Sequence, residues 1–166
     1  DVDALPIRED TIPQPVSPYG VTKLAGEHLC HLYYTNLEVP AVRLRYFTVY
    51  GPRQRPDMAF NKLIQTMLRE EPFPLYGDGE QTRDFTFVGD VVEANILAAK
   101  ALPGRVFNIA GGSRVTVNEV ITMLEELVGR PARLDRQERR AGDQRHTWAD
   151  TSAAREALGY VPQVGL

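Results

Sequence analysis

The sequence is poor in cysteine and histidine and contains no long apolar run. Its single cysteine, Cys30, rules out an internal disulfide framework and fits a reducing compartment, so we expect a cytoplasmic protein. No apolar run reaches the ~18 residues that a membrane span needs, and we expect no membrane partner. The three histidines form no metal-ligand spacing with each other or with Cys30, which argues against a structural zinc site.

Lysine is also scarce, and the charge balance is slightly acidic. The net charge is −3, with 22 acidic and 19 basic residues, so a nucleic-acid partner has no global electrostatic support. Only three of the basic residues are lysine; the other sixteen are arginine. Arginine forms paired hydrogen bonds with carboxylate and phosphate oxygens. On composition alone, however, a GC-rich or heat-adapted genome explains the arginine excess better than anion binding does.

Helix and strand signals alternate along the chain. Ser17-Pro18 marks a helix start, because serine caps a helix and proline fits its first turn. Gly129 and Gly159 each mark the end of a helix, and we expect Asp90 to cap another. Helices are predicted at 19–36, 59–71, 90–102, 117–129 and 151–158, and strands at 41–47, 73–76, 82–88, 106–110 and near 133. This alternation predicts an α/β fold with a largely parallel sheet.

A glycine-rich dinucleotide turn is absent from this sequence. Dinucleotide-binding folds open with a strand, such a turn, and a helix whose N-terminus holds the pyrophosphate. Gly111-Gly112-Ser113 follows a predicted strand but lacks the spaced third glycine, and we interpret it as an ordinary loop. The first residue is Asp and not Met, so we expect that preceding sequence has been removed or left out.

Tyr19 and Lys23 lie four residues apart on a predicted helix, so their side chains share one face. An ammonium group beside a phenol favours the phenolate, and the pair can therefore act as a base near neutral pH. The spacing alone is a weak signal, because it arises easily by chance. The residues around it, from Ser17 to Glu27, are more informative.

The segment S-P-Y-G-V-T-K-L-A-G-E closely resembles the YxxxK helix of the extended short-chain dehydrogenases/reductases. This family contains NAD-dependent sugar-nucleotide epimerases, dehydratases and decarboxylases. Further segments resemble the family in order and spacing, at 45–53, 76–91, 107–112, 140–143 and 149–162. The resemblance covers essentially the whole chain.

The resemblance implies the C-terminal portion of a Rossmann-type doubly wound parallel sheet plus a smaller α/β substrate lobe. The N-terminal dinucleotide-binding half, with the family's catalytic Ser or Thr, is expected to be absent, so the isolated chain should be inactive. Residues 1–51 and 89–112 would belong to the NAD-binding domain, and 52–88 and 113–166 to the nucleotide-sugar lobe. We expect the strands near 42–47 and 106–110 to share one parallel sheet, with helices 19–36 and 90–102 packed against it.

The resemblance also implies roles for individual residues. Tyr19 would be the general base, and Lys23 would favour its ionised form and hold the nicotinamide ribose. The expected NAD contacts are Tyr19, Lys23 and Tyr46. The expected nucleotide contacts are Leu75, Tyr76, Arg83, Arg140 and Asp143. For Leu75 and Tyr76 ordinary strand packing is nearly as good an explanation, and Arg140 lies in a basic run that could simply be solvated.

Thr48 and Arg55 bear on the identity of the sugar. Together with G-P-R-Q-R-P-D-M they look most like UDP-glucuronate 4-epimerases, in which the matching residues hold the sugar carboxylate. A guanidinium fork and a hydroxyl would satisfy such an anion. The alternative is that Arg55 pairs with Asp57 on the loop surface.

The function that follows is NAD-dependent 4-epimerisation of a UDP-sugar, with UDP-glucuronate as the preferred substrate, through a 4-keto intermediate. The alternatives are a UDP-glucose 4-epimerase, a 4,6-dehydratase, a decarboxylase, or a non-catalytic NAD(P)-binding regulator. Retention of both Tyr19 and Lys23 argues against the regulator. The resemblance further implies a homodimer that pairs through the helix 19–36.

Overall fold

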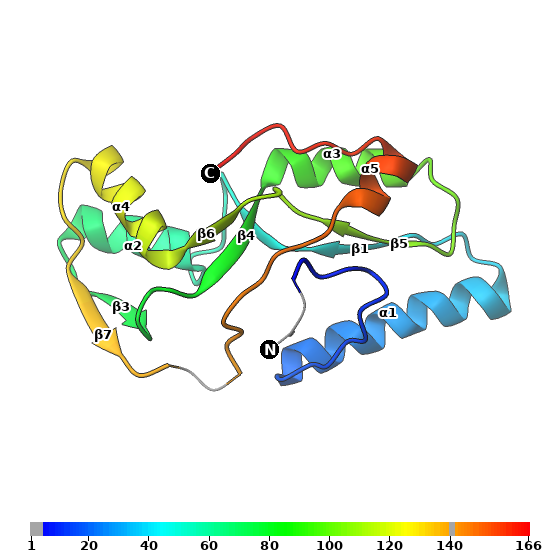
Figure 1. Ribbon diagram of the computed structural model, residues 1–166, viewed down its shortest axis with the longest axis horizontal. Coiled ribbons are helices and arrows are strands. Elements are labelled where there is room, and N and C mark those ends of the chain that lie inside the picture. Colours follow the sequence, from blue (N-terminus) through cyan, green and yellow to red (C-terminus); the bar gives the residue numbers. More distant parts are fainter. Residues whose placement is uncertain (1–4, 140–141) are drawn as a thin grey trace.

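The computed structural model describes residues 5–139 and 142–166, which form an α/β fold (Figure 1). The helices are α1 (Pro18–Leu37), α2 (Ala59–Arg69), α3 (Val88–Ala98), α4 (Val117–Val128) and α5 (Ser152–Leu158). The strands are β1 (Arg43–Tyr46), β2 (Thr48–Tyr50), β3 (Phe73–Tyr76), β4 (Thr82–Phe87), β5 (Val106–Ile109), β6 (Arg114–Thr116) and β7 (Leu134–Gln137). Within the described residues, no helix is both long and apolar enough to cross a membrane.

Strands β1 and β5 form a parallel pair whose register runs from Arg43↔Val106 to Tyr46↔Ile109. This confirms the predicted shared parallel sheet. The chain passes from β1 into β2 through Phe47, and β2 pairs in parallel with β4. Strand β4 also pairs with β6, in antiparallel orientation. The sequence did not predict β2 and β6, because a strand of three residues is too short to show a periodicity.

Helices α3 and α5 cover one side of the β1–β5 pair, and α1 lies on the other side (Figure 1). The core between α3, α5 and β5 consists of Ala94, Ala98, Phe107, Ile109, Ala154, Leu158 and Tyr160. The Tyr160 hydroxyl donates to the Ala110 carbonyl at 3.0 Å. Helix α5 therefore packs against the Rossmann portion although it falls within 113–166; the division into two lobes stays a prediction.

Helix α1 begins as predicted, with Ser17 as its N-cap and Pro18 in its first turn. None of its side chains is fully buried. It approaches the loop before β5 closely, because a Cβ on Gly104 would lie 2.3 Å from the Tyr34 ring. Helix α1 is thus held to the sheet through a few contacts, whereas α3 packs through a buried apolar face.

A second core joins α2, α4, β3 and β4 at the other end of the molecule (Figure 1). Its buried members are Leu63, Met67, Phe73, Leu75, Phe85, Val120, Ile121 and Leu124. Strands β3 and β7 form a parallel pair at its edge. A capping box between Thr116 and Glu119 fixes the start of α4.

The expectation that Asp90 caps a helix is wrong. Helix α3 starts two residues earlier, at Val88, with Phe87 in the N-cap position. The Asp90 carboxylate instead accepts hydrogen bonds from the backbone N–H groups of Gln163 and Val164, at 3.1 and 3.3 Å. It therefore ties the end of the chain to α3. The stops predicted at Gly129 and Gly159 are confirmed, and both glycines adopt the left-handed conformation.

Candidate active site

Tyr19 and Lys23 lie in the first two turns of α1, as predicted. The Lys23 ammonium sits 5.3 Å from the centroid of the Tyr19 ring, within cation–π range. Tyr19 is 71% exposed, so both groups are open to a ligand. Lys23 makes no ion pair with any residue in 5–139 and 142–166. The pair therefore offers a phenol and an unneutralised ammonium on one exposed surface.

One turn further along α1, Glu27 is held by Arg45 of β1. Arg45 donates from Nε and Nη2 to the two carboxylate oxygens, at 2.8 and 2.6 Å. These bonds lower the pKa of Glu27 and raise that of Arg45, against the opposing effect of burial. This two-point ion pair fixes α1 against the sheet.

Arg83 and Asp143, both predicted to contact the nucleotide, form an ion pair with each other. Arg83 Nη2 donates to Asp143 Oδ1 at 2.6 Å, and Arg83 Nη1 donates to the Thr82 carbonyl at 2.9 Å. The fold thus brings together two residues that lie 60 positions apart. Arg140 lies outside the described residues. The nucleotide roles of all three stay predictions.

His146 lies at the centre of this region, and the sequence did not single it out. Its Nδ1 is 2.8 Å from the Thr82 hydroxyl oxygen. Burial, and then the nearby guanidiniums, lower the pKa of His146; these guanidiniums belong to Arg114, Arg145, Arg83 and Arg139. Four guanidiniums therefore lie near His146, although Arg83 and Arg145 are paired with the carboxylates of Asp143 and Asp78. From the sequence, the basic run 133–145 is open to interpretation as a solvated surface; the fold brings Arg114 of β6 and Arg83 of β4 close to it.

Asp84 forms a buried support next to Arg83. It is fully buried, and its Oδ1 accepts the backbone N–H groups of Gly111 and Gly112, both at 3.1 Å. Its Oδ2 accepts the N–H of Ala149 at 3.1 Å. Burial raises the pKa of Asp84, while these hydrogen bonds act in the opposite direction. Asp84 thus links β4 to the loop after β5 and to the segment that follows His146.

The two residues predicted to hold a sugar carboxylate are placed differently. Thr48 is half-buried on β2, in register with Phe85. Arg55 donates from Nε and Nη2 to the two oxygens of Asp57, at 3.1 and 2.8 Å. The side chains of this pair are 74% and 62% exposed. The structure thus contains the alternative, in which Arg55 pairs with Asp57 on the loop surface. The binding of a sugar carboxylate by Thr48 and Arg55 stays a prediction.

Leu75 and Tyr76 lie on β3. Leu75 is only 2% exposed and belongs to the second core, as strand packing alone would require. Tyr76 is half-buried, and its carbonyl accepts a hydrogen bond from Gln81 Nε2 at 3.0 Å. Of the two, Tyr76 therefore has more surface to offer a nucleotide.

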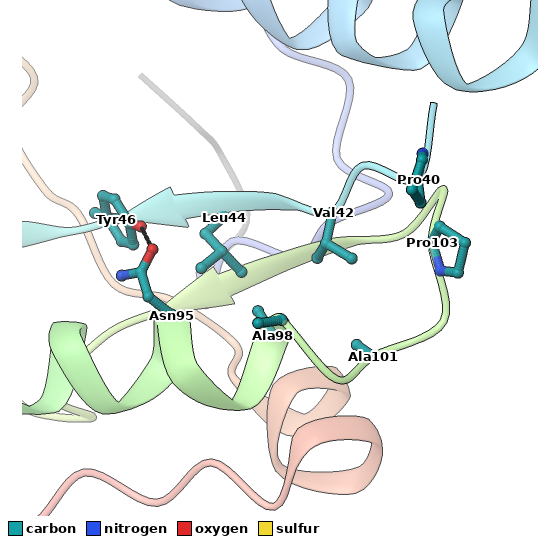
Figure 2. A pocket seen from close by; sticks show the side chains of 9 residues that line it. Pro40, Val42, Leu44, Tyr46, Asn95, Ala98, Ala101 and Pro103 are labelled. Atoms are coloured by element: carbon teal, nitrogen blue, oxygen red, sulfur yellow. Dashed lines mark hydrogen bonds between the residues drawn. The ribbon is translucent and has the colours of Figure 1, made fainter. Parts of the chain in front are cut away.

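Tyr46 lines a groove of about 400 Å³ between β1 and α3 (Figure 2). Its hydroxyl donates to Asn95 Oδ1 at 2.9 Å. The adjacent Arg45 reaches Glu27 on the other side of the sheet, as the alternation of side chains along a strand requires. The structure thus brings Tyr19 and Lys23 together but does not bring Tyr46 to them.

The sequence model of the GDP-mannose 4,6 dehydratase family matches residues 1–166. The chain belongs to this family. Membership confirms the resemblance to the extended short-chain dehydrogenases/reductases that the YxxxK helix and the later segments indicated.

Similar proteins extend this finding. The chain is 46% identical to the uncharacterized UDP-glucose epimerase YtcB of Bacillus subtilis, over 96% of this chain and 51% of that protein. It is 36% identical to the UDP-glucuronate 4-epimerase of Thermodesulfobacterium geofontis, over 97% of this chain and 50% of that protein. It superimposes with a TM-score of 0.93 on the UDP-glucuronic acid 4-epimerase of Bacillus cereus in complex with UDP-glucuronic acid and NAD. The identity there is 48%, over 96% of this chain and 52% of that one.

The chain thus spans about half the length of these family members. It corresponds to the C-terminal portion of their Rossmann-type fold, which confirms the predicted fold class.

Proposed function

We propose that this chain is the C-terminal part of an NAD-dependent UDP-sugar 4-epimerase. The observation that carries the proposal is the Tyr19–Lys23 pair, an exposed phenol beside an ammonium that has no carboxylate partner among residues 5–139 and 142–166. The names of the relatives support it, since epimerases of UDP-glucose and of UDP-glucuronate are both among them. We place the enzyme in the cytoplasm.

The residues of α1 fit NAD, because an exposed ammonium and phenol can both hydrogen-bond ribose hydroxyls. When bound, NAD supplies a reversible hydride acceptor for C4 of the sugar. Tyr19 accepts the proton of the 4-hydroxyl as C4 is oxidised. After the 4-keto sugar has rotated to present its other face, Tyr19 returns that proton as C4 is reduced again. Lys23 favours the ionised phenol through its charge. The reaction has no net redox change.

The nucleotide would lie against the positive region around Arg83. Arg83 can donate to diphosphate oxygens, and Asp143, which fixes Arg83 at 2.6 Å, can also accept a ribose hydroxyl. Arg140 would add a second guanidinium. The guanidiniums near His146, which after burial are the second cause of its lowered pKa, support an anion at this place.

Among the sugars we favour UDP-glucuronate, with Thr48 and Arg55 on its carboxylate. This requires Arg55 to exchange Asp57 for the substrate. Such an exchange costs little, since exposed ion pairs contribute only about 0–1 kcal/mol. A neutral UDP-glucose is the alternative, and dehydratase or decarboxylase activity would share the first oxidation.

We also propose that the complete enzyme is a homodimer that pairs through α1. Val21, Leu29 and Leu32 share the outer side of this helix and are 54%, 55% and 46% exposed. An apolar face of this kind suits an isologous contact with a second copy.

The test is a chimaera that places the N-terminal half of the B. cereus enzyme before Asp1. We expect this protein to interconvert the two 4-epimers of a UDP-sugar, measured by chromatography of the products. Tyr19→Phe should lower kcat by about 10²–10⁴-fold, because it removes the proton acceptor. The matched control is Tyr33→Phe on the same helix, which should retain activity. An active Tyr19→Phe protein would contradict the proposal.

A further inference from the structure

Glu27 lies on the same face of α1 as Tyr19 and Lys23. Tyr19, Lys23 and Glu27 follow one another at intervals of four residues, so their side chains form one row along the helix. A lysine and a glutamate at this spacing attract each other and commonly pair. A free Glu27 carboxylate would therefore compete for the Lys23 ammonium.

In the structure Glu27 pairs with Arg45 of β1 and not with Lys23. Its Nε and Nη2 occupy both Glu27 oxygens, and its Nη1 donates to the Glu9 carbonyl at 3.0 Å. The side chains of Arg45 and Glu27 are only 24% and 21% exposed, so solvent screens this pair less than a surface pair. Each oxygen of the Glu27 carboxylate thus accepts a hydrogen bond from Arg45.

The other charged groups around Glu27 act in the same direction. Arg43 of β1 and His28 of α1 each lower the pKa of Glu27, though less than Arg45 does. The Glu9 carboxylate acts on Arg45 and raises its pKa. Glu27 therefore stays ionised and bound to the sheet, while Lys23 remains over the Tyr19 ring.

We propose that Arg45 is a positioning residue that keeps the Glu27 carboxylate away from Lys23, and so reserves the ammonium charge for Tyr19. Arg45 does not touch the substrate in this proposal; it acts through Glu27. The catalytic meaning of the inference rests on the proposed function. The separation of Glu27 from Lys23 can be tested in the 166-residue chain and does not depend on that function.

The first experiment measures Lys23 directly, by competitive acetylation of the 166-residue chain with acetic anhydride and mass spectrometry. Lys62 and Lys100, the only other lysines, are internal references. Only an unprotonated amine reacts, and a carboxylate partner keeps the amine protonated. Arg45→Met should therefore slow acetylation of Lys23 about twofold relative to the references. Glu27→Gln alone should not slow it, because Arg45 already holds Glu27.

The decisive control is the double variant Arg45→Met/Glu27→Gln, which removes the competing charge and should restore the Lys23 rate. If Arg45→Met disturbs the helix, as circular dichroism would show, Arg45→Lys replaces it, since an ammonium cannot engage both oxygens as a fork does. An unchanged Lys23 rate in the single variants of Arg45, or a slow rate that the second change does not restore, overturns the proposal.

The second experiment concerns activity in the chimaera. Arg45→Met should move the acid side of the kcat/KM pH profile to higher pH, and adding Glu27→Gln should move it back. Damage to folding would lower the rate at every pH and would not be reversed. If the parent chimaera has no epimerase activity, the proposed function fails, while acetylation still decides whether Arg45 keeps Glu27 from Lys23.

Discussion

Arg45 and Arg55 each form a two-point ion pair, but water screens the two pairs to different extents. Arg45 and Glu27 are largely shielded, whereas Arg55 and Asp57 are mostly exposed. Loss of a partner costs more in a pair that water screens little than in an exposed pair, which contributes about 0–1 kcal/mol. Arg45 is therefore suited to hold an element in place, and Arg55 is suited to change its partner.

Arg55→Ala in the chimaera should lower kcat/KM for UDP-glucuronate much more than for UDP-glucose. Removing the guanidinium leaves the sugar carboxylate unpaired, at a cost of about 2–5 kcal/mol, and a neutral hydroxymethyl group loses far less. Steady-state kinetics with both sugars provide the measurement. The control is Asp57→Asn, which frees Arg55 and should not impair UDP-glucuronate. Equal losses for the two sugars on changing Arg55 would return the substrate to a neutral hexose.

At the scale of elements, the segment after β7 is fixed to β4 and to the β3–β4 turn by polar contacts. Arg145 donates to both oxygens of Asp78, at 2.8 and 2.7 Å, and the Thr82 N–H donates to the Arg145 carbonyl at 3.0 Å. The Arg83–Asp143 pair adds a third connection. These contacts hold Asp143, which lies outside any helix or strand, against Arg83 of β4.

The local signals explain which elements the sequence predicted. Ser17, Gly129 and Gly159 act on their own neighbours, so the ends of α1, α4 and α5 could be placed from the sequence. Asp84 could not be interpreted in this way, because its three backbone donors come from segments 27 to 65 residues away. The same holds for Asp90, whose partners follow 73 and 74 residues later.

Asp78→Asn should make the free energy of unfolding depend less on pH in the acid range, where Asp78 titrates. Hydrogen bonds from Arg145 and from the Glu80 backbone lower the pKa of Asp78 from 3.8 to about 2. The folded state thus binds fewer protons than the unfolded state between these values. The Asp78 contribution is therefore present above pH 3.8 and is lost as the pH falls toward 2.

Urea unfolding of the chain at pH 7 and at pH 3 would measure this effect. Asp78→Asn should lower the midpoint at pH 7 more than at pH 3. Glu138→Gln, an exposed change on the same segment, is the control and should alter neither midpoint. An equal drop at both pH values would show that the carboxylate charge of Asp78 does not stabilise the fold.

At the scale of the molecule, the β1–β5 pair has one unpaired edge and one face that is covered only loosely. Along β1 no described residue pairs with the edge opposite β5, and the groove of Figure 2 runs beside β1. On the far side of the sheet, α1 contributes no buried side chain. The chain in which these two surfaces are open spans about half the length of the relatives that it matches. Of the two, the α1 surface is the one that we propose for the contact with a second copy.

Leu29→Arg should separate the proposed dimer of the chimaera into monomers. In a two-fold contact through α1 each Leu29 faces the other copy, so the change places two like charges in one apolar interface. Sedimentation velocity should give a dimer for the parent and a monomer for the variant. Leu127→Arg, on α4 and 81% exposed, is the matched control and should remain dimeric. A dimeric Leu29→Arg protein would exclude this face as the interface. A variant that fails to fold while Leu127→Arg folds would place Leu29 inside the protomer, and the dimer would then have to form elsewhere.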